Sequence, residues 1–164
     1  MVTQGDGKLA TRLLEAGDRE AVSRILESVG NFSEQEQRIA LELIDAWLNV
    51  GEASDYLCWV LVDDAGVRGY VCIGPTPLTD GTFDLYWIAV DPLAQGRGYG
   101  QALTQLAEDE ARARGGRLLL IETASQEAYA ATIRFYERAG YQLVSTIRDF
   151  YKTGDDKLTL AKLR

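Results

Sequence analysis

Apolar side chains recur at helical spacing in two stretches near the start of the chain. Asp18 can cap the first predicted helix, and Ser33 with Glu36 has the spacing of a capping box before the second. Each helix has an apolar stripe: Val22, Ile25, Leu26 and Val29 in the first, and Ala40, Leu43, Ile44, Trp47 and Leu48 in the second. A short strand is predicted before them, at residues 11–16.

Continuous apolar runs predict a sheet in the middle of the chain. Residues 56–62 and 67–73 flank a polar turn that ends at Gly66, so we expect a hairpin. Residues 82–90, TFDLYWIAV, are almost wholly apolar, as expected of a central strand buried on both faces. A helix from about residue 99 to residue 114 is ended by two glycines, and residues 117–121, RLLLI, form another buried strand.

The last part of the chain adds a helix and two strands. Ser125 can cap a helix that ends at Gly140, and strands are predicted at residues 141–151 and 157–163. The resulting order of seven strands and four helices indicates the mixed α/β class, with helices on the faces of the sheet. The 164 residues suit one domain, which we place at residues 11–164, after a flexible N-terminus at residues 1–10 that begins with a polar, glycine-containing stretch.

The charge balance and the missing histidine exclude several kinds of function. With 17 basic and 25 acidic residues, the net charge is −8, so nucleic acid and anionic membranes are poor partners and cationic amines are favoured. The absence of histidine removes Ser-His-Asp and Cys-His catalysis and most zinc chemistry, and we expect no metal. Acid–base work falls to Asp, Glu, Tyr, Lys or Cys.

The two cysteines indicate a reducing compartment. Cys58 and Cys72 lie in apolar runs and are expected to be buried free thiols, although they could face each other across a hairpin. Nothing before them resembles a signal peptide, and no apolar run is long enough to span a membrane. The simplest interpretation is a soluble, cytoplasmic protein, monomeric or homodimeric.

A glycine-rich turn, Gln95 to Gly100, lies between a buried strand and a helix. Glycines there let the backbone approach a ligand, and the start of the helix favours anions, so pyrophosphate is the natural guest. The alternating glycines fit neither the dinucleotide fingerprint nor a Walker loop. A connector that needs glycine only for the turn is the alternative.

Two motifs resemble the GNAT superfamily of acetyl-CoA-dependent N-acetyltransferases. The sequence V-D-P followed by Q-x-x-G-x-G resembles the family's acetyl-CoA loop, and ATIRFYERAGY resembles its helix that ends in F-Y-x-x-x-G-Y/F. The resemblance runs from about residue 11 to residue 163. It implies a GNAT-like fold, a central, mostly antiparallel seven-stranded sheet flanked by about four helices. Tyr129 and Thr132 replace an asparagine and an alanine of many members, which weakens any assigned contact to the pantetheine arm there.

The resemblance also implies a set of residues for acetyl-CoA, the cosubstrate. In the family the amides of this loop hold the coenzyme A pyrophosphate, and the backbone N–H of Ile88 faces the thioester oxygen. Arg97 and Arg138 could reach phosphates. The implied cofactor-binding residues are Ile88, Ala89, Val90, Gln95, Gly96, Arg97, Gly98, Tyr99, Gly100 and Tyr136.

The reaction needs a base for the amine proton and an acid for the leaving thiolate. Asp84 is the first candidate base, because it is the only charge in its strand and burial raises a carboxyl pKa. It aligns with the acidic base of histone-type family members, although a structural carboxylate is equally compatible. Glu122, at the end of RLLLI, is the second candidate base. Tyr136 matches the family tyrosine that faces the coenzyme A sulfur, and core packing is its alternative role.

These features predict an N-acetyltransferase that moves an acetyl group to a primary amine of a small molecule by direct attack in a ternary complex. The alternatives are a non-catalytic coenzyme A-binding or regulatory protein on the same fold, or transfer of another acyl group. The acceptor pocket is expected from residues 30–32, the second helix and residues 149–151. There Asp149, beside Phe150 and Tyr151, could hold an ammonium group.

Overall fold

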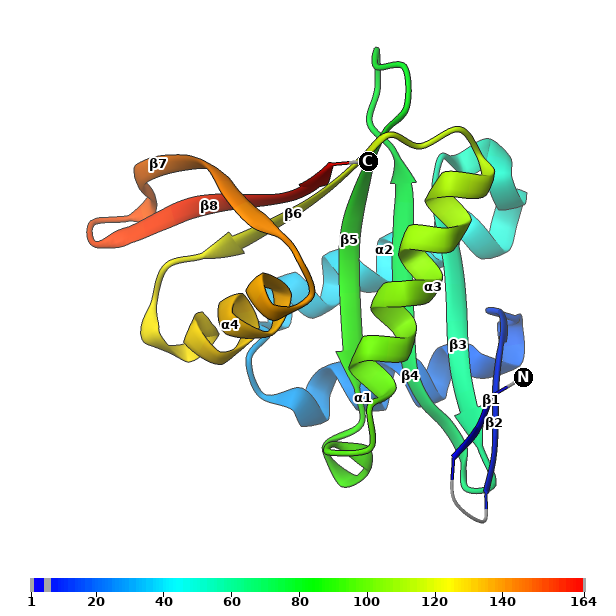
Figure 1. The fold of residues 1–164 in the computed structure, drawn as a ribbon. Helices are drawn as coiled ribbons and strands as arrows, with labels where there is room; N and C mark the ends of the chain where they lie inside the picture. Colours follow the sequence, from blue (N-terminus) through cyan, green and yellow to red (C-terminus); the bar gives the residue numbers. More distant parts are fainter. Residues whose placement is uncertain (1, 5–6, 164) are drawn as a thin grey trace.

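The computed structural model describes residues 2–4 and 7–163, and this part of the chain forms one mixed sheet with helices on both faces (Figure 1). The sheet order is β1-β2-β3-β4-β5-β6-β8-β7, antiparallel except for the β5–β6 pair. The strands are β1 (Val2–Gln4), β2 (Gly7–Leu13), β3 (Leu57–Asp63), β4 (Gly66–Pro75), β5 (Thr82–Val90), β6 (Leu118–Ala124), β7 (Gln142–Lys152) and β8 (Asp155–Leu163). The α-helices are α1 (Arg19–Val29), α2 (Glu34–Val50), α3 (Tyr99–Ala113) and α4 (Ala130–Arg138).

The predicted fold class is confirmed, with one strand more than predicted. All seven predicted strands and four predicted helices are present, and β1 is an eighth strand that pairs with β2. The flexibility expected of residues 1–10 stays a prediction, and residues 2–4 and 7–10 are strand in this structure. Among the described helices, none is both long and apolar enough to cross a bilayer.

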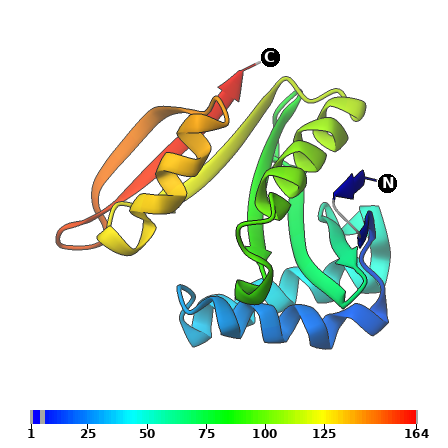
Figure 2. The ribbon, with the colours of Figure 1, turned by 60° about the horizontal axis from the view of Figure 1, so that its bottom comes forward.

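The strict alternation of side chains in β3 and β4 explains why helices cover both faces. Along β3, Trp59 and Leu61 face the cluster that contains α3, while Cys58 and Val60 face the cluster that contains α1 and α2. Figure 2 shows α1 and α2 on one side of these strands and α3 on the other. The cysteines are buried free thiols, as expected, and Cys58 lies directly opposite Cys72 in the β3–β4 ladder.

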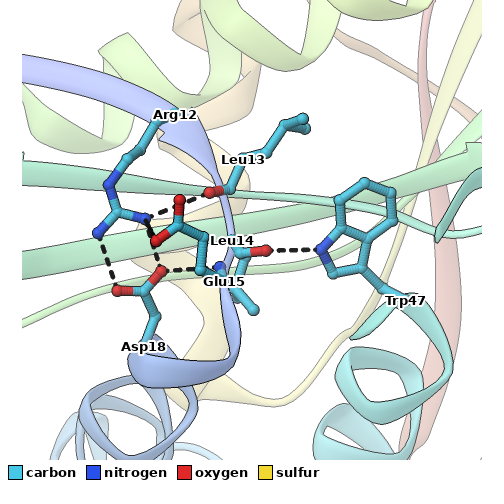
Figure 3. Close-up of polar contacts among 6 residues, drawn as sticks. All are labelled: Arg12, Leu13, Leu14, Glu15, Asp18 and Trp47. Atoms are coloured by element: carbon cyan, nitrogen blue, oxygen red, sulfur yellow. Dashed lines mark hydrogen bonds and ion pairs between the residues drawn. The ribbon is translucent and has the colours of Figure 1, made fainter. Parts of the chain in front are cut away.

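The first predicted strand corresponds to β2, which begins and ends earlier than predicted. It covers Gly7–Leu13 instead of residues 11–16, because the chain turns into a 3-10 helix, Ala16–Asp18, before α1. The turn is held by side chains, as Figure 3 shows. The indole Nε1 of Trp47, on α2, donates to the carbonyl of Leu14 at 2.9 Å, which ties the end of the strand to this helix.

Asp18 has a different role from the predicted helix cap. Its carboxylate accepts hydrogen bonds from the two terminal nitrogens of the Arg12 guanidinium, at 2.6 and 2.9 Å. It also accepts one from the backbone N–H of Glu15, at 2.8 Å (Figure 3). The hydrogen bond from Arg12 is the main cause that lowers the pKa of Asp18. The side chain therefore fastens β2 to the start of α1. At α2 the predicted capping box is present, with Ser33 and Glu36 exchanging two hydrogen bonds of 3.1 Å.

The sheet opens between β5 and β6. The two strands pair only from Thr82 to Leu85 on β5, opposite Leu118 to Ile121 on β6, and beyond these residues they diverge. A register shift in the β4–β5 ladder leaves Tyr86 without a partner on β4, just where the divergence starts. Figure 2 shows β6, β7 and β8 leaning away from the rest of the sheet. The second half of β5 is therefore only partly buried, in contrast to the prediction of a strand buried on both faces, because a cleft replaces the covering layer.

Candidate active site

A cleft with a volume of about 1300 Å³ opens where β5 and β6 diverge. Most of its lining comes from β5, β6, α4 and the glycine-rich turn with the start of α3, and further residues come from the connection between α1 and α2, with the helix ends that flank it, and from the β7–β8 hairpin. Of the predicted catalytic and cofactor-binding residues, Arg97 alone is absent from its lining. The others that line it are Asp84, Ile88, Ala89, Val90, Gln95, Gly96, Gly98, Tyr99, Gly100, Glu122 and Tyr136.

The glycine-rich turn has the backbone conformation that its sequence requires. Gly96 and Gly98 have φ values of 81° and 80°, a left-handed conformation that other residues adopt at a cost. Gly98 is the N-cap of α3, so the first N–H groups of this helix have no acceptor within it. These donors and the positive end of the helix dipole lie beside the cleft, which suits an anionic group.

A carboxylate at the end of β3 contacts two residues of the glycine-rich turn. Asp63 accepts a hydrogen bond from the Tyr99 hydroxyl at 2.9 Å, at the first turn of α3. The guanidinium of Arg97 lies 3.6 Å from the same carboxylate, and that of Arg68 lies 3.7 Å from it. The side chain of Arg97 is thus engaged by Asp63, whereas Arg138 lines the cleft. A role of Arg97 toward phosphates stays a prediction.

Asp84 lies on β5 at the point where the strands separate. It is half-buried, and burial is the main cause that raises its pKa above the ordinary value, with the charge of Glu122 adding to the rise. The Thr76 hydroxyl donates to its Oδ2 at 2.6 Å, which opposes the rise. A raised pKa suits a base, and the bond to Thr76 suits a structural carboxylate, so the geometry is compatible with both roles.

Glu122 is a weaker candidate base than Asp84 on this geometry. It comes directly after the part of β6 that pairs with β5, and its side chain is exposed. Its carboxylate lies 3.3 Å from the ammonium of Lys157, on β8. Glu122 therefore lies in a more hydrated position than the half-buried Asp84 and already has a cation as its partner.

Ile88 lies beyond the last residue of β5 that pairs with β6. Its partner on the other side is Val71, on β4, so the edge of β5 that faces the cleft has no strand partner there. Backbone groups at such an edge are available to a ligand. This is compatible with the predicted N–H donor at Ile88.

Tyr136 lies on α4 and is only 2% exposed. Its ring makes edge-to-face contacts with Phe135 and Tyr141, at centroid distances of 5.2 and 5.5 Å. Burial raises the pKa of Tyr136 well above its ordinary value, so the phenol keeps its proton throughout the neutral range. The residue thus packs in the core and lines the cleft at the same time.

Comparison with known proteins decides the family. Residues 19–141 match the acetyltransferase (GNAT) family, a stretch that contains β5, the glycine-rich turn, β6 and α4. The chain belongs to the GNAT acetyltransferase family. The family indicated by the two sequence motifs is confirmed.

Solved structures agree with this assignment. A GNAT-family protein from Desulfovibrio desulfuricans is 41% identical, with a TM-score of 0.90 over 96% of this chain and 98% of that one. The predicted GNAT-like fold is thus confirmed. A Salmonella typhimurium protein solved with its cofactor acetyl-CoA has the same fold at 21% identity, with a TM-score of 0.73 over 94% of this chain and 93% of that one.

A curated relative is longer than this chain. The mycothiol acetyltransferase of Beutenbergia cavernae is 31% identical over 116 residues, which cover 70% of this chain. The same match covers 38% of the relative's length, so this chain corresponds to only part of it.

The far end of the GNAT cleft contains part of the predicted acceptor pocket. Asn31 and Phe32 line it, as does Tyr151, and the ring of Phe32 meets Trp87 edge-on at a centroid distance of 5.2 Å. The hydroxyl of Tyr129 donates to the carbonyl of Asn31 at 2.9 Å and so joins two segments 98 residues apart.

Asp149 and Phe150 do not line this cleft, in contrast to the expectation that they would hold an ammonium group. Asp149 has a φ of 56°, and its carboxylate accepts the N–H of Gly154 at 2.8 Å, so it closes the turn between β7 and β8. The Phe150 ring is covered by the ammonium of Lys157, 4.8 Å from its centroid.

Asp155 and Tyr129 also line this end, and the sequence did not single them out for it. Asp155 was placed in a turn, whereas it is the first residue of β8. The sequence carried no signal for this role, because Lys152–Asp156 has the composition of an ordinary polar turn. Tyr129 was noted only as a departure from the family pattern.

Proposed function

We propose that this GNAT-family protein is an N-acetyltransferase that moves an acetyl group from acetyl-CoA to a primary amine of a small molecule. The amine attacks the thioester directly while both substrates are bound. One observation supports this most: the glycine-rich turn and the candidate base and acid all line one cleft, which opens where β5 and β6 diverge. A mere glycine connector would need no such cleft.

The chain's residues fit coenzyme A. The donors at the start of α3 suit the pyrophosphate, and the space beside Gly96, where a Cβ would lie, is open. A volume of about 1300 Å³ leaves room for the pantetheine arm and an acceptor together. Bound acetyl-CoA supplies the thioester to be attacked.

Asp84 receives the proton of the attacking ammonium, directly or through water. An alkylammonium has a pKa of about 10.4, so most of it is protonated at neutral pH and a base is needed. The nitrogen then forms its bond to the acetyl carbon, and the backbone N–H of Ile88 donates to the oxygen that gains negative charge. A preorganised donor of this kind contributes about 3 kcal/mol.

Tyr136 gives its proton to the sulfur as the carbon–sulfur bond breaks. Burial makes its phenol a weaker acid than a free tyrosine, so proton transfer is driven by the negative charge that builds up on sulfur nearby. The nitrogen loses its second proton to water as the intermediate collapses, and Tyr136 takes a proton back from water. The products are an N-acetylated amine and the free thiol of coenzyme A.

The setting of the reaction is part of the same proposal. One domain, residues 11–164, acts as a monomer or homodimer in the cytoplasm, which the two buried and unlinked cysteines favour. A small amine is proposed as the acceptor because aromatic side chains line this part of the cleft and the bond from Tyr129 to Asn31 joins two of its segments.

A turnover screen tests the proposal. The purified chain is incubated with acetyl-CoA and, in parallel, succinyl-CoA, together with amino acids, small alkylamines, aminoglycosides or peptides, and thiol release is followed. We expect release that depends on both acetyl-CoA and an amine. Faster turnover with another acyl-CoA would assign a different acyl group, and binding without turnover would assign a non-catalytic role.

A further inference from the structure

The acceptor end of the cleft contains a buried carboxylate oxygen that lacks a donor. Asp155 is only 3% exposed, and it lines the cleft. The side-chain amide of Gln126 donates to its Oδ2 at a long 3.3 Å. Among the described residues nothing donates to its Oδ1. A buried charge without its partner is costly, so folded proteins rarely keep one without a use.

Two further carboxylates and two tyrosines gather around Asp155. Burial, and then the charges of Glu122 and Asp155, raise the pKa of Tyr151. Burial, and then the charges of Glu36 and Asp155, raise the pKa of Tyr129. Both rings thus lie within range of Glu36, on α2, and Asp155, on β8, and all four side chains belong to residues that line the cleft.

The lysines near this part of the cleft pair with only one of its acids. Lys157 is paired with Glu122 at 3.3 Å and also covers the ring of Phe150. Lys152 lines the cleft, and it has no ion pair among the described residues. Four carboxylates line the cleft, namely Glu36, Asp84, Glu122 and Asp155, and among the described residues only Glu122 has an ion pair.

We propose that the acceptor carries a second ammonium group, which binds between Tyr129 and Tyr151 and pairs with Asp155. The inference rests on the proposed function and names its substrate class: a small diamine, acetylated on the amine that reaches Asp84. A carboxylate pairs with an ammonium by a charge-assisted hydrogen bond, and aromatic faces hold it by cation–π attraction.

Glu36, which also lines the cleft, adds a second carboxylate to the proposed subsite. Its Oε1 accepts the N–H of Ser33 in the capping box. Its charge nevertheless adds to the raised pKa of Tyr129 and Tyr151, so it lies near the proposed subsite. A glutamine at this position can keep the capping bond while it removes the charge, which makes Glu36→Gln a clean probe.

Three amines with the same five-carbon chain and different groups at the far end test the proposal. With saturating acetyl-CoA, kcat/KM is measured for 1,5-diaminopentane, 1-aminopentane and 5-aminopentan-1-ol, and for diamines with three to eight carbons. We expect the best diamine to exceed its monoamine by about tenfold or more at low salt, with the ratio falling as salt rises. Asp155→Asn and Glu36→Gln should each lower this ratio. The control Glu127→Gln removes an equal charge outside the cleft and should keep it.

The outcomes separate this inference from the proposed function. Equal kcat/KM for diamine and monoamine would overturn the inference and leave the proposed acetyltransferase function intact. The same conclusion would follow if the ratio of diamine to monoamine kcat/KM were unchanged in both Asp155→Asn and Glu36→Gln. If Asp155→Asn does not fold, the ratio in Glu36→Gln decides. If no amine is acetylated, the proposed function fails, and calorimetry with 1,5-diaminopentane against 1-aminopentane decides whether the subsite exists.

Discussion

Gly98→Glu places a side chain and a negative charge where the proposed pyrophosphate lies. Gly98 has a φ of 80° and begins α3, and its backbone lines the cleft. The substitution therefore does two separable things. It strains the backbone, because L residues disfavour a left-handed φ, and it opposes an anion at the N-terminus of the helix.

The two effects differ in size and in what they change. A left-handed φ costs about 1–2 kcal/mol, and in a domain of this size each kcal/mol lowers Tm by about 2–4 °C. Like charges about 4 Å apart repel by about 1 kcal/mol in water and by about 4 kcal/mol at a protein surface. Affinity should therefore fall by about fivefold to a thousandfold, while Tm falls by only about 2–8 °C.

Two matched variants separate strain from charge. Gly98→Ala adds the backbone strain without the charge, and Gly115→Glu adds the same charge at a φ of 83° in an open turn outside the cleft. Isothermal titration with acetyl-CoA measures Kd, and a thermal scan measures Tm. We expect a large loss of affinity in Gly98→Glu alone. Unchanged affinity in folded Gly98→Glu protein, or an equal loss in Gly115→Glu, would refute the assignment of the phosphate site.

Three further substitutions test other parts of the account. Tyr136→Phe should lower kcat by about a hundredfold or more with unchanged Kd for acetyl-CoA, measured by thiol release, whereas a kcat within a few-fold of wild type would leave the residue a packing role only. Glu122→Gln should lower the pKa of Asp84, whose pKa the charge of Glu122 raises, so the acid limb of the kcat profile should move to lower pH; an unmoved limb would argue against Asp84 as the base. Asp18→Asn should lower the free energy of unfolding in urea at pH 7 by about 1–3 kcal/mol, nearer the lower figure because Arg12 is 41% exposed. Since the folded pKa of Asp18 is lowered, that difference should be present above its ordinary value of 3.8 and shrink as pH falls below it, and a constant difference would contradict the ion pair as the cause.

Much of the fold was predictable because its signals are local. The capping box at Ser33 and the apolar stripes of α1 and α2 depend on residues a few positions apart, and both were found as predicted. The predictions that were wrong involve distant partners. Asp18 pairs with Arg12 in place of capping a helix, and Trp47 reaches back 33 residues to the chain at Leu14. Local patterns contain no information about such partners.

The two ends of the cleft differ in the same way. The proposed cofactor end is formed largely by one continuous segment, Gln95 to Gly100, and its glycine pattern made this end predictable from the sequence. The acceptor end is assembled from separate segments, which meet through the bond between Tyr129 and Asn31. Asp149 was favoured because of its neighbours in sequence, but the turn at Gly154 uses its carboxylate. The open half of β5 was predicted as buried, since an apolar strand that lines a ligand cleft has the same pattern as a covered one.

The central claim is that this chain acetylates amines with acetyl-CoA. The most direct measurement incubates the purified chain with acetyl-CoA and 1,5-diaminopentane and quantifies, in the same sample, free coenzyme A thiol and N-acetylated amine by mass spectrometry. The account predicts both products in equal amounts from the wild-type chain and almost none from Tyr136→Phe. Tight acetyl-CoA binding with neither product, across the whole set of amines, would contradict it.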